Sequence, residues 1–420
     1  MIRADTAFGA IAVALALPSV AHAQSEERLS ADVAANAGYS NNPFSVVGDD
    51  TGSALLAITV SPRYQVLTQR STVTLSGDAN LQQYLRRYGR NDSYSGAVDY
   101  VLRASERVTA HTRLDLSSAV LGSFTGFQPG AVGIVPDGVT AGGTSAGGTA
   151  ITPITSPSLV PVTDIGLFGL RNRRRLARIN GDVSIGVSAR DSLTVSGYAE
   201  ATRYSSLQQF GDYEAYNVSL GYSRQISDRF TAGLRASAST YDYKQTNSDS
   251  RVFPVEATLS GRLSAIWTVD GALGVTFVDS DSVGSTRRTS LSGSFNLCRR
   301  GELSVMCVQG ARQVSPTGLV GTQYVTTAGL SWSRRLSERE NLSLDANYSK
   351  VGGDQNRLLL SALPLQNEFL QGVVGYDRQI SQRLRFLASA NYRQLLGGNA
   401  GRPKDFGGQV GLSYRIGDPR

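Results

Sequence analysis

The sequence predicts an all-β protein, a single transmembrane antiparallel β-barrel of about 18 strands. Three observations indicate this fold class. Segments of strand length that alternate apolar and polar residues recur along the whole chain. The connections between these segments alternate between short turns and longer polar loops. Beyond the N-terminal segment, no apolar run approaches the roughly 18 residues that a membrane-spanning helix requires.

The clearest alternation lies close to the C-terminus, between Phe406 and Ile416. Its apolar face carries Phe406, Val410, Leu412, Tyr414 and Ile416, and its other face is polar or glycine. A period of two residues indicates a strand with one apolar and one polar side. No later segment remains to cover the apolar side, so we expect that side to face lipid and the polar side to face a lumen.

The same alternation places the other strands. An even strand count puts both ends of the barrel on the same side of the membrane. The expected strands lie near residues 29–39, 56–66, 73–81, 94–102, 108–116, 177–188, 193–204, 213–226, 230–243, 252–263, 266–278, 290–298, 303–312, 324–336, 342–350, 370–380, 384–394 and 406–416.

A short serine-containing turn recurs between neighbouring strands. Residues 104–108 read Ala-Ser-Glu-Arg-Val, residues 226–230 read Ile-Ser-Asp-Arg-Phe, and similar turns occur at 336–339 and 380–384. These turns all follow even-numbered strands, whereas the longer polar loops follow odd-numbered strands. In bacterial outer-membrane barrels the short turns are periplasmic and the long loops are extracellular. We expect the same arrangement here.

One connection is much longer than the others, at about 122–172. Its middle, Gly130 to Pro161, is rich in Gly, Thr, Pro and Ala and carries a single charge, Asp137. Such a composition cannot bury enough apolar surface to fold alone. We expect an extracellular loop that either extends into solvent or folds inward as a constriction.

The N-terminus has the features of a secretory signal peptide, residues 1–23. Arg3 is followed by the apolar stretch from Ala7 to Leu17 and by a small-residue cleavage site at Ala21-His22-Ala23. The alternative is a first membrane helix. Residues 24–420 then form one barrel domain, which we expect in the outer membrane of a Gram-negative cell. The net charge of +7 indicates contact with anionic lipopolysaccharide or an acidic polymer rather than nucleic acid.

Enzyme chemistry has little support. The pattern Gly-x-Ser-x-Gly at Gly143–Gly147 matches a nucleophile elbow, but it lies in the Gly/Thr-rich loop instead of a strand–turn–helix unit. His111 is the one histidine left after cleavage, and no cluster has metal-ligand spacing. We expect no catalytic residue, no metal and no cofactor.

Cys298 and Cys307 are the two cysteines of the chain and flank a short turn. Their spacing allows them to face each other across a hairpin, and an exported protein folds in an oxidising compartment. We predict a cross-strand disulfide that fixes the register of this hairpin; the alternative is a pair of reduced thiols.

The inward faces carry the functional information. Charged side chains cost little in a hydrated lumen, and barrels of about 16–18 strands are wide enough for an aqueous channel. We therefore predict a channel for a hydrophilic solute; the alternative is a structural or adhesion barrel with a filled lumen. The predicted pore-lining residues are Asp99, Arg103, Arg113, Asp115, Arg178, Asp182, Arg235, Glu256, Arg262 and Asp270, with Arg63, Asp78, His111, Glu200, Arg393 and Arg415 also turned inward.

A basic cluster closes the long loop: Arg171, Arg173, Arg174 and Arg175. We expect it at the extracellular end of the sixth strand, where it either binds lipopolysaccharide phosphates, attracts an anionic solute, or is a solvated run of charges. Aromatic residues gather at both predicted interfaces, as aromatic belts do. Trp267 and Trp332 lie near short turns, and the tyrosines near long loops are Tyr39, Tyr94, Tyr216, Tyr324, Tyr348 and Tyr392.

The last strand also resembles the C-terminal assembly signal of bacterial outer-membrane proteins. Gln409, Gly411, Tyr414 and Ile416 occupy its polar, glycine, aromatic and terminal positions, although Ile416 stands where an aromatic residue is usual. The whole mature chain resembles outer-membrane β-barrel porins. This resemblance implies outer-membrane lipid, lipopolysaccharide and the barrel-assembly machinery as partners.

A narrower resemblance rests on the Leu-Ser-Glu-Arg turn at 336–339 and the hairpin of Cys298 and Cys307. Both are similar to features of β-barrel porins associated with exopolysaccharide secretion. That resemblance implies a passive conduit for a polymer and a periplasmic polysaccharide export protein as partner.

Overall fold

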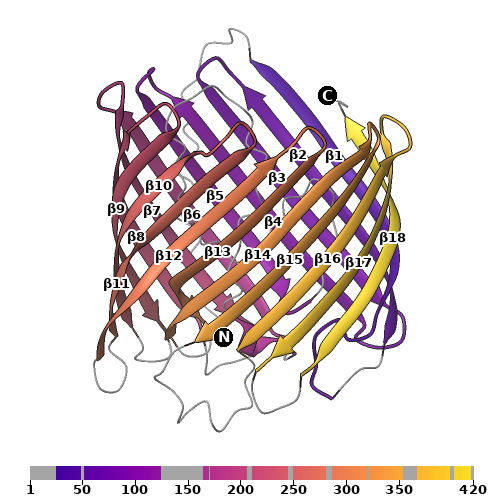
Figure 1. Ribbon diagram of the computed structural model, residues 1–420. Coiled ribbons are helices and arrows are strands. Elements are labelled where there is room, and N and C mark those ends of the chain that lie inside the picture. Colours follow the sequence, from indigo (N-terminus) through magenta and orange to yellow (C-terminus); the bar gives the residue numbers. More distant parts are fainter. Residues whose placement is uncertain are drawn as a thin grey trace, which may run out of the picture.

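The computed structural model describes residues 25–48, 52–123, 164–169, 171–205, 211–244, 249–280, 286–318, 321–352, 367–397 and 402–417. Eighteen strands form one closed antiparallel barrel, shown in Figure 1. Each strand pairs with its neighbours in sequence, and β1 (Glu26–Ser40) pairs with β18 (Lys404–Gly417) to close the wall. The predicted fold class, strand number and strand order are confirmed.

The strands between β1 and β18 lie within a few residues of their predicted positions. They are β2 (Ser53–Leu67), β3 (Ser71–Tyr84), β4 (Arg90–Arg103), β5 (Val108–Val120), β6 (Arg173–Gly186), β7 (Asp191–Tyr204), β8 (Tyr213–Gln225), β9 (Phe230–Tyr243), β10 (Ser250–Arg262), β11 (Trp267–Ser280), β12 (Thr286–Arg300), β13 (Ser304–Thr317), β14 (Gly321–Ser337), β15 (Glu340–Gly352), β16 (Glu368–Gln379) and β17 (Leu384–Leu396).

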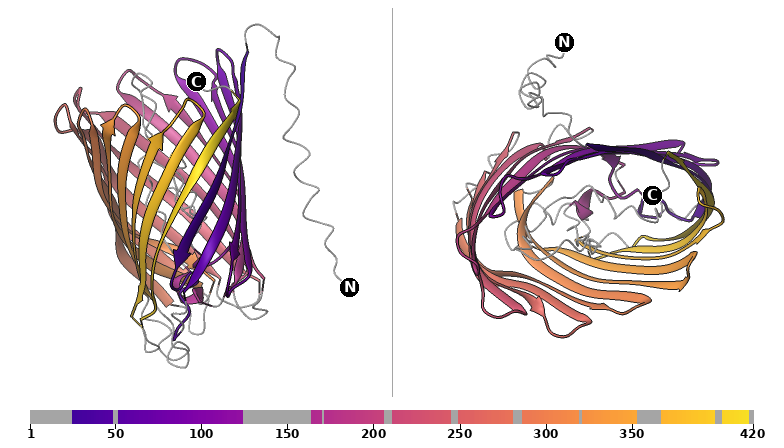
Figure 2. Two further views of the ribbon diagram at one scale, coloured as in Figure 1. Left: turned by 90° about the vertical axis from the view of Figure 1, so that its right-hand side faces the viewer. Right: turned by 90° about the horizontal axis from the view of Figure 1, so that it is seen from above.

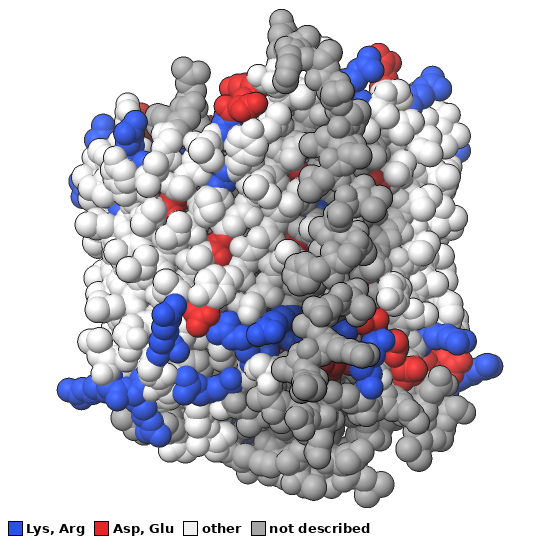
Figure 3. Space-filling view, turned by 180° about the vertical axis from the view of Figure 1, so that it is seen from behind, with Lys and Arg blue, Asp and Glu red and all other residues white. Residues whose placement is uncertain are grey.

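The outer wall is apolar because alternate residues of each strand face outward. In β2, Leu56 and Ile58 are exposed, whereas Leu55 and Ala57, which alternate with them, are buried. Figure 3 shows that charged side chains are sparse over the middle of one face and gather toward its two ends. A closed barrel leaves no unpaired strand edge, and an apolar belt of this kind suits the hydrocarbon core of a bilayer. Within the described residues, we find no helix with the length and apolarity to cross a bilayer.

The short turns lie at one end of the barrel, where β1 begins and β18 ends (Figure 1). Their recurring serine has a structural reason. The hydroxyl oxygens of Ser105, Ser227, Ser264 and Ser381 each accept hydrogen bonds from the amides two and three residues further on. This local bonding replaces the strand ladder where the chain reverses, as serine does in tight turns.

The wall departs from a regular barrel between β12 and β13. A disulfide joins Cys298 and Cys307, which are directly opposite each other near the short-turn end. The ladder between these strands then stops at the pair Gly293 and Arg312. Beyond this pair both strands continue, but β12 stays paired with β11 and β13 stays paired with β14. In Figure 1 the far end of β13 passes behind β12, into the barrel.

Candidate functional site in the barrel lumen

A short segment of the long β5–β6 connection lies inside the barrel, as Figure 2 shows from above. Residues 164–169 include the 3-10 helix η2 (Ile165–Leu167), and the side chain of Ile165 is fully buried. Ile165 packs against Phe369 of β16 and Leu395 of β17. The neighbouring Asp164 contacts the opposite side of the lumen. We call residues 164–169 the crossbar, because they reach from one wall to another.

Asp164 holds the second end of the crossbar. Its carboxylate accepts a hydrogen bond of 2.7 Å from the hydroxyl of Tyr204 on β7 and another of 2.7 Å from the amide of Gly318, at the tip of the β13–β14 hairpin. The guanidinium of Arg174 lies 3.8 Å away. Burial raises the pKa of Asp164 to about 6, against the opposing effect of these hydrogen bonds. The side chain is 2% exposed, so it belongs to a closed interface rather than an open passage.

A buried ionic network lies on the wall beneath Asp164. Glu200 of β7 accepts a hydrogen bond of 2.9 Å from the hydroxyl of Tyr213 and lies 4.0 Å from Arg174 and 3.8 Å from Arg178. The guanidinium of Arg178 stacks 4.3 Å above the ring of Tyr198. Buried charges are tolerated only with such partners, because transfer from water is costly. The network therefore braces this part of the wall.

An aromatic cluster fills the space between the wall of β8–β11 and the β13–β14 hairpin. The amide of Thr317 donates a hydrogen bond of 3.3 Å to the hydroxyl of Tyr243, and the hydroxyl of Thr322 donates one of 3.0 Å to the hydroxyl of Ser250 on β10. The hairpin thus lies against the inner wall. The buried members of the cluster are Tyr213, Ala215, Tyr241, Tyr243, Val252 and Val278, and Tyr198, Tyr204, Val314 and Tyr324 pack against them.

The β1–β2 loop narrows the lumen from another side. Phe44 is fully buried, with its ring centroid 5.6 Å from that of Tyr84 and 5.3 Å from that of Tyr88. Arg393 of β17 anchors this loop. Its guanidinium donates to the carbonyl of Pro43 at 2.9 Å and to that of Gly122 at 2.8 Å, and is itself held by Asp405 at 2.6 Å. Two loops and one hairpin therefore constrict the long-loop end.

Of the predicted alternatives for the long loop, its described C-terminal part folds inward. The middle of the loop, residues 130–161, lies outside the described residues, as does the predicted signal peptide, residues 1–23. The Gly143–Gly147 pattern falls in the same undescribed part of the loop.

Beyond the constriction the inner wall is polar and partly exposed. His111 lies between two carboxylates, 2.8 Å from Asp99 and 3.2 Å from Asp182, and each of these side chains is about 30% exposed. Arg113 donates to Asp115 at 2.8 Å on the same strand. Strand alternation places all ten predicted pore-lining residues on the inward face: Asp99, Arg103, Arg113, Asp115, Arg178, Asp182, Arg235, Glu256, Arg262 and Asp270.

These ten residues differ in exposure. Arg235 donates to Glu256 at 3.2 Å, so this pair is neutral as a unit. Arg103, Arg262 and Asp270 are exposed toward the short-turn end. Arg178 is a correction to the prediction, because it is only 4% exposed, stacked on the ring of Tyr198, and does not line an open passage.

The predicted basic cluster does not form, which is a second correction. Residues 173–175 belong to β6, so their side chains alternate between the two faces. Arg174 points inward and is buried, whereas Arg173 and Arg175 point outward, with Arg173 3.2 Å from Asp92. Arg171 instead places its guanidinium 4.7 Å from the ring centroid of Phe44. The sequence alone does not show where the loop ends and the strand begins.

Tyr324 is a third correction. Tyr39, Tyr94, Tyr216 and Tyr392 are 40–51% exposed on the outer wall near the long loops, as predicted for an aromatic belt. Tyr324 instead packs against the lumenal tyrosine cluster, and its hydroxyl is buried. Its strand enters the barrel at this point.

The predicted assembly-signal residues occupy two faces of β18. Tyr414 and Ile416 point outward, while Gln409 is buried on the inner side. A side chain at Gly411 would overlap the carbonyl oxygen of Ala35 and the side-chain amide oxygen of Asn36 on β1. The close approach of these strands therefore requires glycine there.

Sequence reasoning missed Asp164, Phe44 and the anchoring role of Arg393. The only sequence signal for Asp164 is its position, as the first charged residue after the uncharged run 138–163. Nothing in the sequence indicates that Phe44 turns inward, because the loop around it is polar.

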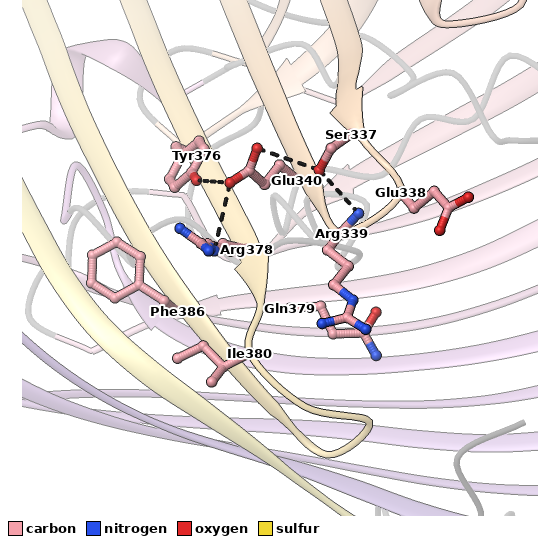
Figure 4. Close-up of a pocket in the computed structure, with 9 residues that line it drawn as sticks. All are labelled: Ser337, Glu338, Arg339, Glu340, Tyr376, Arg378, Gln379, Ile380 and Phe386. Carbon is pink, nitrogen blue, oxygen red and sulfur yellow. Dashed lines mark hydrogen bonds and ion pairs between the residues drawn. The ribbon is translucent and has the colours of Figure 1, made fainter.

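A surface concavity of about 810 Å³ lies at the short-turn end and is shown in Figure 4. Glu340 accepts a hydrogen bond of 3.0 Å from the hydroxyl of Tyr376 and lies 3.5 Å from Arg378. Glu340 and Arg378, two of the four charged residues that line the concavity, are therefore paired with each other. Across the described residues, no three metal-binding side chains converge on one point.

Comparisons with known proteins add little at the level of sequence. No protein-family model matches the chain, and no curated protein matches it significantly. Among solved structures, OccK11 (OpdR) of Pseudomonas aeruginosa is 12% identical, with a TM-score of 0.44, and the match covers 93% of this chain and 96% of that one. OccK2 (OpdF) in complex with glucuronate is 10% identical, with a TM-score of 0.42 and coverage of 93% and 98%. OprD is 10% identical, with a TM-score of 0.41 and coverage of 93% and 95%. Similarity at this level assigns neither a family nor a solute to this chain.

Proposed function

We propose that this protein is an outer-membrane channel that passes small hydrophilic solutes through a constriction at its extracellular end. One observation carries the proposal: partly exposed charged groups, including Asp99, His111 and Asp182, line the inner wall beyond the crossbar. A lumen that served only as a packed core would bury such groups completely, since unhydrated charge is costly, whereas each of these side chains stays about 30% exposed.

The constriction limits the size of the solute. The crossbar, the loop around Phe44 and the β13–β14 hairpin all occupy the same end of the barrel. Small polar molecules need only the space between these segments. Export of an exopolysaccharide, the narrower prediction, requires that at least the crossbar withdraw, so we place it second.

The charge pattern favours neither sign strongly. The wall of β4–β6 presents Asp99, Asp115 and Asp182, together with His111 and Arg113. Arg103 and Arg262 add positive charge toward the short turns. We therefore expect a channel that conducts both cations and anions, with selectivity set by size more than by charge.

Conductance of the refolded mature protein in a planar bilayer tests the proposal. We expect small steps from the intact chain and larger steps after deletion of 130–161 together with the crossbar. The correct fold of both proteins is checked by heat-modifiable gel mobility. Silence from both folded proteins overturns the channel and favours the structural or adhesion barrel.

We also propose that lipopolysaccharide phosphates bind the outer wall rather than a loop. Arg175 is exposed and lies directly opposite Arg203 on the neighbouring strand. The guanidinium of Arg203 is held by Glu214 at 2.7 Å, so Arg175 supplies the exposed positive charge that an anionic group beside this pair can neutralise. Figure 3 shows Lys and Arg gathered in a band toward this end. The apolar Ile179 lies on the same face of β6, two outward positions deeper in the wall, where an acyl chain can pack.

Native mass spectrometry with lipid A tests this binding. The double variant Arg175→Ala and Arg203→Ala should lose most of the bound lipid, and dephosphorylated lipid A should bind poorly to the unaltered protein. Arg287→Ala is the matched control, because Arg287 is also an outward arginine, 89% exposed and 3.7 Å from Asp279, on a distant strand of the wall. Equal retention of lipid A by both variants contradicts the site.

A further inference from the structure

The end of the β13–β14 hairpin occupies an unusual place. The β12–β13 ladder stops at Gly293 and Arg312, and within the described residues no ladder pair joins residues 289–292 of β12 to β13. Residues 313–317 of β13 pair with β14 alone. Past the last pair, the edge of β12 therefore lies in the wall, whereas the edge of β13 that would continue the ladder lies in the lumen.

The sequence of the displaced strands still has the pattern of an outer wall. Counting from Val308, which is exposed on the lipid-facing side, Val314 and Pro316 fall on the outward face of β13. Tyr324 is opposite Val314 on β14 and falls on the same face. Beyond Arg312, whose guanidinium lies 5.5 Å from the ring centroid of Tyr324, this face is apolar and ends in tyrosine, as the outer wall does elsewhere at Tyr39, Tyr94 and Tyr216.

Extending the β12–β13 register past its last pair tests this pattern. The next pairs are Ser292 with Gln313, Leu291 with Val314, and Ser290 with Ser315. Leu291 is 67% exposed on the lipid side, so the extended pairing joins two apolar residues outside and polar residues inside. Register is specified by such agreement of faces, because a shift of one residue would invert it.

We propose that the long-loop end of the β13–β14 hairpin is a gate with two positions. In the closed position it lies in the lumen, as in this structure. In the open position it pairs with residues 289–292 of β12 and completes the wall. The inference rests on the channel function proposed above, and it adds the element that regulates the constriction.

The two positions exchange defined contacts. Opening breaks the hydrogen bonds from Thr317 to Tyr243, from Thr322 to Ser250 and from Gly318 to Asp164. It forms backbone hydrogen bonds with β12 and returns Val314 and Tyr324 to lipid. Because Gly318 also holds Asp164, opening removes one support of the crossbar, so the hairpin and the crossbar should move together.

Paired cysteines distinguish the two positions. Ser250→Cys with Thr322→Cys should lock the closed gate, since the two hydroxyl oxygens are 3.0 Å apart. Leu291→Cys with Val314→Cys should lock the open gate. Ser294→Cys with Ala311→Cys is the positive control, because these residues are already opposite each other. Leu291→Cys with Gln313→Cys is the register control, since in the open position these side chains are on opposite faces.

We expect oxidation in proteoliposomes to cross-link the first three pairs and not the register control. The closed lock should reduce conductance severalfold, and the open lock should raise it severalfold; the unaltered protein, with its native disulfide, is treated identically. Failure of Leu291→Cys with Val314→Cys to cross-link, while the positive control does, overturns the gate. Unchanged conductance of both locked forms also overturns it. Cross-linking in both positions without conductance in any form would instead overturn the channel function and leave a two-position hairpin.

Discussion

The amide of Gly318 donates a hydrogen bond of 2.7 Å to the carboxylate of Asp164. This bond joins two segments that are far apart in the sequence, the tip of the β13–β14 hairpin and the crossbar of the β5–β6 connection. Tyr204 of the barrel wall donates to the same carboxylate. A single side chain thus links the wall and two of the elements that narrow the lumen.

The charge state of Asp164 should therefore control the constriction. Burial raises its pKa from 3.8 to about 6, so the docked crossbar binds a proton more tightly than the released one. A raised carboxyl pKa means that docking is strongest at low pH and weakens as pH rises from about 4 to 6. The full effect is about 3 kcal/mol at most, at 1.36 kcal/mol for each pKa unit.

We expect conductance to increase between pH 4 and pH 6.5 in the unaltered protein. Asp164→Asn should show conductance that changes little over this range, since it keeps an acceptor but cannot ionise. Asp78→Asn is the control, because Asp78 also points inward but accepts a hydrogen bond from Ser61 of the wall. A pH response that survives in Asp164→Asn contradicts the role of this carboxyl.

The apolar end of the crossbar gives a second prediction. Ile165 is fully buried against Phe369 and Leu395, and truncation of a buried isoleucine to alanine costs about 2–5 kcal/mol. In Ile165→Ala we expect the crossbar to detach for part of the time, which should appear as larger and noisier conductance steps. Ile179→Ala removes the same atoms from the lipid-facing side, where Ile179 is 47% exposed, and should leave the steps unchanged.

The barrel itself was predictable from sequence because alternation and turn length are local properties. The segment from Phe406 to Ile416 shows its two faces without any partner strand, and the serine turns mark several of the reversals at the short-turn end. Closure follows because a strand edge in lipid would be left without hydrogen bonds. The inward residues were equally accessible, since a period of two fixes them once one outward residue is known.

The constriction was not predictable, because it depends on contacts between distant segments. Arg174 was assigned to a basic loop cluster, but strand alternation turns it toward Glu200. Tyr324 was assigned to the outer belt because it falls on the outward face of its strand. It lies in the lumen instead, because β13 leaves β12 and carries β14 inward with it. No local signal shows where a strand leaves the wall.

The disulfide gives a third prediction. Cys298 and Cys307 are opposite each other in the part of the β12–β13 ladder that remains paired, close to the point where the strands separate. A cross-link that closes a loop of this length contributes about 2–3 kcal/mol in the chain-entropy description. We expect Cys298→Ser with Cys307→Ser to form a complete barrel with faster amide hydrogen exchange in β12 and β13. Exchange in β3 and β4, far from the bond, is the internal control, and acceleration there would show a general loss of stability instead.

The buried ion pair that holds the β1–β2 loop at the long-loop end gives the last prediction. Arg393 and Asp405 are both nearly inaccessible, and the guanidinium also holds the carbonyls of Pro43 and Gly122. Loss of one partner from a buried ion pair costs about 3–5 kcal/mol, because the other charge stays buried without compensation. Arg393→Ala should therefore release the β1–β2 loop, and a protease added from outside should cut within 41–48 several times faster than in the unaltered protein. Arg385→Ala alters the same face of the same strand near the short turns and should leave the cleavage rate unchanged. If both variants are cut equally slowly, Phe44 and its ring contacts hold the loop without the guanidinium.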